Sequence, residues 1–204
     1  MKWREFRHYE ASTPTFDHWW AFPVCAYDHT FAGNERAVFE EVKDDPSIKK
    51  IILTRSRQVD VRGENVEIVP LMSRPGQELL ARSGQIFVKH GPRINAHWPV
   101  PSTTHNFINL WHGTPLKRFG SASIDIPPAA EVALQRNNGA SRVVLASGAM
   151  DRLAMRRPSR RSDSRMCGLR GFHATTSSFA PTTSFRPTSG RASTDCVPRS
   201  MDAG

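Results

Sequence analysis

The feature that most constrains the fold of this chain is a series of short apolar runs separated by segments with helical spacing. The runs are continuous rather than alternating, and they cover residues 18–26, 50–54, 66–71, 85–89, 107–111 and 142–146. Helical patterns lie between or after them, at 34–43, 77–82 and 147–155. Continuous apolar strands are typical of sheets that are buried on both faces. The sequence therefore predicts an α/β domain, a Rossmann-like parallel sheet with helices on both sides.

One strand is followed by residues suited to phosphate chemistry. In open parallel sheets ligands bind beyond the carboxyl ends of the strands, and the run 107–111 ends directly before His112. Gly113 allows the backbone to turn, Thr114 can cap the helix that follows, and Lys117 falls in the first turn of that helix. Such a corner often only reverses the chain. Its other interpretation is a phosphate site in which free N–H groups, a positive helix end and an ammonium lie beside a proton acceptor.

The same corner carries a resemblance to a known family. The heptapeptide at 111–117 reads Trp-His-Gly-Thr-Pro-Leu-Lys, and it resembles the signature of the CDP-glycerol glycerophosphotransferase family. Members of that family are bacterial enzymes that build teichoic acids and related polyol-phosphate polymers. Supporting features upstream are Trp20, Phe22, Asn34 and the segments 48–53 and 86–88. The resemblance covers about residues 16 to 150.

The resemblance implies an architecture and a reaction. Family members have two Rossmann-like domains facing a cleft, as in B-type glycosyltransferases, and the N-terminal domain presents the acceptor side and the signature histidine. The implied reaction transfers glycerol phosphate from CDP-glycerol to a hydroxyl of a lipid-linked polyol-phosphate acceptor. His112 would be the catalytic base, and Gly113, Thr114 and Lys117 would contact substrate. Work at the inner, cytoplasmic face of the membrane as a peripheral protein is also implied. No metal or other cofactor is expected, and the identity of the polyol stays open because glycerol and ribitol enzymes share the motif.

The composition of the chain changes abruptly at Arg156. Residues 156–204 hold nine arginines and three aspartates but no lysine, glutamate or isoleucine, so they carry most of the formal net charge of +9. A segment dominated by Arg, Ser and Thr buries too little apolar surface to offset its ordering entropy. We therefore expect an acceptor-side domain at 1–155 and a disordered tail at 156–204. The tail is either a basic arm or the product of a shifted reading frame, and the second interpretation is favoured because the resemblance stops at the same place.

The chain contains no match to the motifs with which the family grips the donor's pyrophosphate. We accordingly expect a truncated or frame-disrupted member with little or no activity alone, in which CDP-glycerol would be bound through the missing domain. Two alternatives belong to other functional classes. One is a basic nucleic-acid-binding protein that uses its Arg-rich tail without sequence specificity. The other is a small non-enzymatic domain that holds an anionic polymer.

Other histidines and one tryptophan have simpler interpretations. His90 and His97 flank a Gly-Pro-Arg segment that is expected to be a loop. The loop could border the cleft, but two solvated loop histidines are the favoured interpretation. His105 lies in a turn rich in Ser and Thr and suggests no role. Trp98 is expected to cover the core of the domain.

The cysteines and the termini add little. Cys25, Cys167 and Cys196 have no metal-binding spacing, which fits an intracellular, reducing environment. No apolar stretch reaches 18 residues, and the charged first ten residues do not resemble a secretory signal.

Overall fold

The computed structural model describes residues 1–113, 127, 129–130, 132, 139–146 and 148–149. Its helices are α1 (Trp3–Ala11), α2 (Asn34–Val42), α3 (Arg74–Arg82) and α4 (Pro92–Ala96). Its strands are β1 (Phe16–Pro23), β2 (Lys49–Thr54), β3 (Val66–Pro70), β4 (Ser83–Val88), β5 (Asn106–Asn109) and β6 (Ser141–Val144). The predicted alternation of strands and helices is thus present in the described part of the chain.

All the described strands form one parallel sheet in the order β3-β2-β1-β4-β5-β6. This is the Rossmann strand order, and it confirms the expected fold class. The chain builds outward from β1 in one direction to β3 and then returns to place β4 on the other side of β1. The order therefore reverses between β1 and β4, where a crevice opens for ligands in folds of this type.

Each central strand contributes side chains to two apolar cores, one on each face of the sheet. One core includes Ala21, Ile51 and Ile86, and the other includes their chain neighbours Phe22, Ile52 and Phe87. Successive strand residues point to opposite faces, so a strand that is covered on both sides must be apolar throughout. This explains the continuous runs in the sequence.

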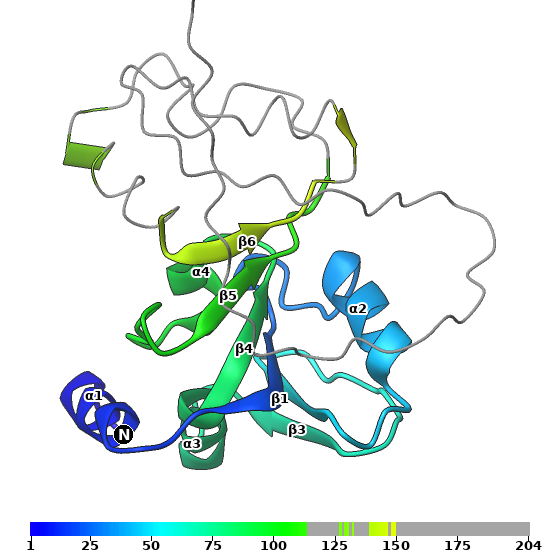
Figure 1. Ribbon diagram of the computed structural model, residues 1–204, viewed down its shortest axis with the longest axis horizontal. Coiled ribbons are helices and arrows are strands. Elements are labelled where there is room, and N and C mark those ends of the chain that lie inside the picture. Colours follow the sequence, from blue (N-terminus) through cyan, green and yellow to red (C-terminus); the bar gives the residue numbers. More distant parts are fainter. Residues whose placement is uncertain (114–126, 128, 131, 133–138, 147, 150–204) are drawn as a thin grey trace, which may run out of the picture. The chain divides into compact units, whose positions relative to one another are not determined.

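The helices divide between the two faces (Figure 1). Phe39 of α2 belongs to one core, whereas Phe6 of α1 and Leu80 of α3 belong to the other. The hydroxyl of Ser73 accepts a hydrogen bond from the N–H of Gly76 at 3.1 Å, which caps α3. Because this cap allows a proline in the first turn, α3 begins at Arg74, three residues before the predicted start.

Helix α1 was not predicted, and a buried polar contact helps to hold it. The ring of Phe6 stacks on Trp98 at 5.3 Å between centroids, which confirms that Trp98 covers the core. The imidazole of His105 contacts the carbonyl of Ser83 at 2.7 Å and the carboxylate of Glu10 at 3.1 Å. The interpretation of His105 as a turn residue without a role was therefore wrong: it joins α1 to the sheet.

Other differences from the predictions concern boundaries. The predicted strand 107–111 is β5 at Asn106–Asn109, and the expected loop after β4 contains α4. Only residues 148–149 of the predicted helix at 147–155 are described. The predicted boundary at 155 lies outside the described residues, as does the Arg-rich tail with the nucleic-acid alternative that depends on it. Among the described helices, none has the length and apolar character needed to cross a membrane.

Candidate active site

Polar side chains converge at the carboxyl edge of the sheet, where the strand order reverses. Asp28 follows β1, Glu35 lies in the first turn of α2, and Lys89 comes directly after β4. His112 follows β5, the strand next to β4. These residues are far apart in sequence, and the fold brings them to one edge.

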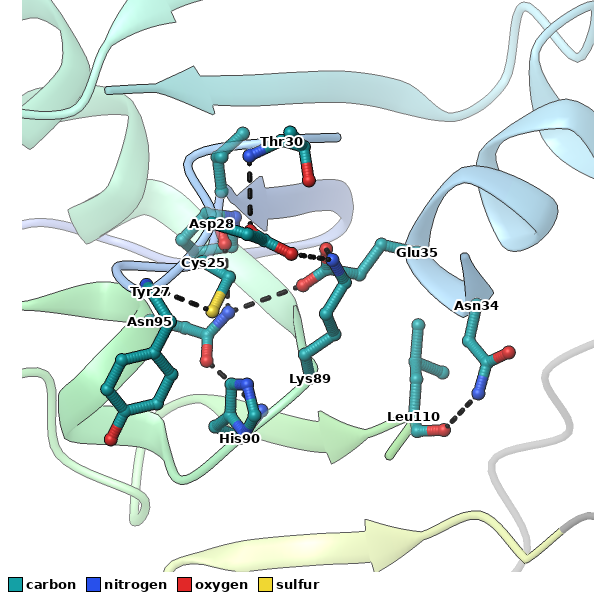
Figure 2. A network of polar contacts seen from close by, with 12 residues as sticks. Cys25, Tyr27, Asp28, Thr30, Asn34, Glu35, Lys89, His90, Asn95 and Leu110 are labelled. Atoms are coloured by element: carbon teal, nitrogen blue, oxygen red, sulfur yellow. Dashed lines mark hydrogen bonds and ion pairs between the residues drawn. The ribbon is translucent and has the colours of Figure 1, made fainter. Parts of the chain in front are cut away.

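Lys89 connects the polar cluster (Figure 2). Its ammonium lies 3.2 Å from the carboxylate of Asp28 and 3.6 Å from that of Glu35. Only 7% of Lys89 is exposed. The ion pair between Lys89 and Asp28 holds the loop after β1 against the end of β4. Partial burial opposes ionisation of Asp28, but hydrogen bonds from the backbone of Thr30 and from Lys89 outweigh it, so the pKa of Asp28 is lowered.

Glu35 is a fully buried carboxyl group that is incompletely satisfied. Its Oε1 accepts a hydrogen bond from the amide of Asn95 at 3.3 Å, whereas its Oε2 has no hydrogen-bond partner and faces Lys89. Burial raises the pKa of Glu35 to about 8, although the positive charge of Lys89 opposes the rise. The carboxyl therefore carries a proton over much of the neutral range.

Asn95 in α4 ties the cluster to the backbone. Its amide also donates to the carbonyl of Pro23 at 3.1 Å, and its oxygen accepts from the N–H of His90 at 3.1 Å. Arg55 follows β2 and supports the same region, and its guanidinium donates to the carbonyls of Val24, Ile94 and Asn95 at 2.8, 3.2 and 3.0 Å. The ends of β1 and β4 are thus fixed to α4.

The corner that carries His112 has an unusual backbone. Trp111 has a φ of 58° and Gly113 a φ of 134°, so both chain neighbours of the histidine have a positive φ. The amide of Asn34, the first residue of α2, donates to the carbonyls of Leu110 at 2.8 Å and Trp111 at 3.2 Å. The carboxamide oxygen of Asn109 accepts from the N–H of Trp111 at 2.9 Å. Left-handed conformations are costly for residues other than glycine, and these hydrogen bonds hold the corner in place.

The imidazole of His112 contacts two other rings. The indole of Trp111 lies at 4.4 Å and 21°, and the imidazole of His90 at 4.4 Å and 47°. Burial, and then the charge of Lys89, lowers the pKa of His112. The pKa of His90 is lowered by burial, by the charge of His112 and by Lys89. Both rings therefore favour the neutral form, which is the form that accepts a proton.

The structure places the predicted site residues as follows. His112 lies beyond the carboxyl end of its strand, and Gly113 adopts a conformation that favours glycine. Thr114 and Lys117 lie outside the described residues, so their roles, like the catalytic role of His112, stay predictions. The expectation of a solvated loop was wrong for His90, which is half-buried against His112.

Sequence reasoning missed the rest of the cluster. Asp28, Glu35 and Asn95 lie in turns or short helices whose pairing depends on the strand order. The one available signal was the pair Lys89 and His90 directly after a buried run, a position equivalent to that of His112. The described residues contain no group of three or more His, Cys, Asp or Glu side chains suited to a metal ion.

The strand order and the edge cluster define the class of the protein: a Rossmann-like α/β domain with its polar site at the point where the strand order reverses. Residues 22–157 match the family model of CDP-Glycerol:Poly(glycerophosphate) glycerophosphotransferase. The match spans more than half of the chain, which therefore belongs to this family, as its resemblance implied. None of the curated protein sequences matches the chain.

Solved structures agree on the fold. The chain is similar to the wall teichoic acid polymerase TagF with a TM-score of 0.59 and 14% identity, over 74% of this chain and 38% of the polymerase. It is also similar to a variant of TagF soaked with CDPG, with a TM-score of 0.57 and 15% identity, over 72% of this chain and 38% of that one. The chain thus spans less than half of the length of these polymerases.

Proposed function

We propose that this chain provides the acceptor-side domain of a CDP-glycerol glycerophosphotransferase and that His112 is its general base. The observation that carries the proposal is the position of His112, beyond β5 at the carboxyl edge of the sheet, in an environment that lowers its pKa. Membership of the family supplies the reaction class.

The proposed reaction has one proton transfer and one phosphoryl transfer. A hydroxyl of the polyol-phosphate acceptor gives its proton to neutral His112 while its oxygen forms a bond to the glycerol-bearing phosphorus of CDP-glycerol. The bond from that phosphorus to the bridging oxygen breaks, and CMP leaves with the electron pair. Because the pKa of His112 lies below its ordinary value of 6.5, the imidazole is unprotonated at neutral pH and can accept a proton.

The neighbouring residues have binding roles in this proposal. Gly113, Thr114 and Lys117 contact phosphate through backbone N–H groups, a hydroxyl and an ammonium. CDP-glycerol is bound by residues outside this domain. The acceptor is lipid-linked, so the enzyme works as a peripheral protein on the cytoplasmic surface of the membrane.

The test separates binding from turnover. Binding of an oligomeric polyol phosphate to the full chain is measured by the change in NMR signals of His112. Turnover is measured as CMP release from CDP-glycerol with a lipid-linked acceptor, in the full-length protein that contains this domain. We expect His112→Asn to lower turnover by about two to four orders of magnitude, the range for loss of a general base. The matched variant His18→Asn, at the opposite end of β1, should have no effect, and normal turnover in His112→Asn would refute the proposal.

A further inference from the structure

We propose that His90 is a positioning residue for His112, and that the two imidazoles form a coupled pair in which neutral His90 keeps His112 ready to accept a proton. The inference rests on the proposed function for the reaction that His112 performs. Its geometric basis is independent of that reaction.

The sheet itself brings the two rings together. β4 and β5 are adjacent and parallel, with Val88 paired to Asn109. His90 comes two residues after β4 and His112 three residues after β5, so both leave the sheet at the same edge. Their ring centroids are 4.4 Å apart with an interplanar angle of 47°. The contact is thus a consequence of strand register.

His90 is held from two other sides. Its backbone N–H donates to the buried side chain of Asn95 at 3.1 Å. The ring of Tyr27 meets the imidazole edge-on at 4.9 Å and 83°, while most of Tyr27, 71%, is exposed. A half-buried ring that is fixed in this way restricts where the ring of His112 can lie. His90 therefore forms a wall of the site.

The charges around the pair limit how many protons it can hold. Burial lowers the pKa of both rings and the positive charge of Lys89 lowers it further, whereas Asp28, which pairs with Lys89, partly opposes this at His90. Glu35 faces Lys89 and has a raised pKa, so it neutralises Lys89 only in part at neutral pH. Protonation of both imidazoles would bring three positive charges together. Protonation of one imidazole therefore disfavours protonation of the other.

This restriction matters for the proposed reaction. When His112 takes the proton of the acceptor hydroxyl, it becomes positively charged. A neutral His90 does not repel this charge, whereas a protonated His90 would. His90 itself neither gains nor loses a proton in the step. His90 affects the pH at which His112 loses its proton and the orientation of the His112 ring. It is therefore a positioning residue.

The experiment is an NMR titration of the imidazole signals in the full chain, which requires no turnover. In His90→Asn we expect the titration midpoint of His112 to rise, because the ring that lies against His112 is lost and with it part of the burial that lowers the pKa of His112. In His112→Asn the midpoint of His90 should rise in the same direction, since coupling between two sites is reciprocal. His18→Asn is the matched control and should leave both midpoints unchanged.

Each outcome decides the proposal. Midpoints that stay unchanged, or that fall, in both variants would overturn it. If His90→Asn fails to fold, the reciprocal variant decides, because linkage requires the same coupling from either side. A coupled titration with normal turnover in His112→Asn would refute the proposed function and leave the pair intact. Unchanged titration midpoints together with a large loss of turnover in His112→Asn would refute the coupled pair and support the proposed function.

Discussion

The side-chain amide of Asn34 donates a hydrogen bond of 2.8 Å to the carbonyl of Leu110, across 76 residues of sequence. The same amide reaches the carbonyl of Trp111, so the first residue of α2 holds the backbone immediately before His112. This contact joins the two halves of the sheet at the candidate active site. It shows that the position of His112 depends on a helix from the other half.

Removing this amide should weaken the corner. We expect Asn34→Ala to lower the free energy of unfolding by about 1 to 2 kcal/mol, since two carbonyls lose their donor. Asn34→Asp is the sharper variant: a carboxylate in the first turn of α2 favours the helix dipole but cannot donate to Leu110 or Trp111. Chemical denaturation measures both variants. A stability gain in Asn34→Asp would contradict the assigned role.

Glu35 should make the stability of the fold depend on pH. Its pKa is about 8 in the folded state against 4.5 as the ordinary value, so between these limits the unfolded chain ionises the group while the folded chain does not. The contribution to stability is fully present below pH 4.5 and is lost as pH rises towards 8. At about 1.4 kcal/mol per unit, the loss is on the order of 3 to 5 kcal/mol.

Glu35→Gln tests this dependence. The variant cannot ionise, so the decline in the free energy of unfolding between pH 5 and 8 should become shallower than in the unmodified chain. Glu41→Gln, on the exposed side of the same helix, is the control and should keep the original slope. Equal slopes in all three proteins would show that Glu35 is ionised in the folded state at neutral pH.

Features of this arrangement that leave a local pattern could be predicted from the sequence, whereas contacts between residues far apart in the chain could not. The strands could be predicted because burial on both faces leaves continuous apolar runs, as at 50–54 and 85–89. The corner at His112 could be predicted because Gly113 and its neighbours form a local pattern. The contact between His90 and His112 could not, because it depends on which strands are adjacent. The role of Glu35 was hidden for the same reason, since a glutamate in a helical pattern usually faces solvent.

The buried contact between His105 and Glu10 should be a main support of α1. Truncation of the side chain in His105→Ala leaves the carboxylate of Glu10 and the carbonyl of Ser83 without this partner. We expect the free energy of unfolding to fall by about 2 to 4 kcal/mol. The control His8→Ala removes an exposed imidazole from α1 and should change stability by less than about 0.5 kcal/mol.

A double-mutant cycle isolates this contact. Glu10→Ala should cost much less in a chain that already carries His105→Ala, because the two side chains act on each other. Strictly additive effects would mean that α1 is held by its apolar contacts alone, such as that between Phe6 and Trp98.

Gly113 should be intolerant of a side chain although it has open space. A Cβ at this position would meet no atom within 4 Å, so Gly113→Ala creates no clash with the described residues. Its φ of 134° is nevertheless a conformation that residues with a Cβ rarely adopt. The variant must therefore either accept strain of about 1 to 3 kcal/mol or change the backbone after His112. In the second case the ring of His112 moves away from His90, and its NMR titration midpoint rises as burial is lost.

Gly139→Ala is the control, since Gly139 has equally open surroundings without a positive φ. This variant should change neither stability nor titration beyond the small effect of a surface substitution. If Gly113→Ala matches this control in both measurements, the conformation of Gly113 is not what holds His112 at the edge of the sheet.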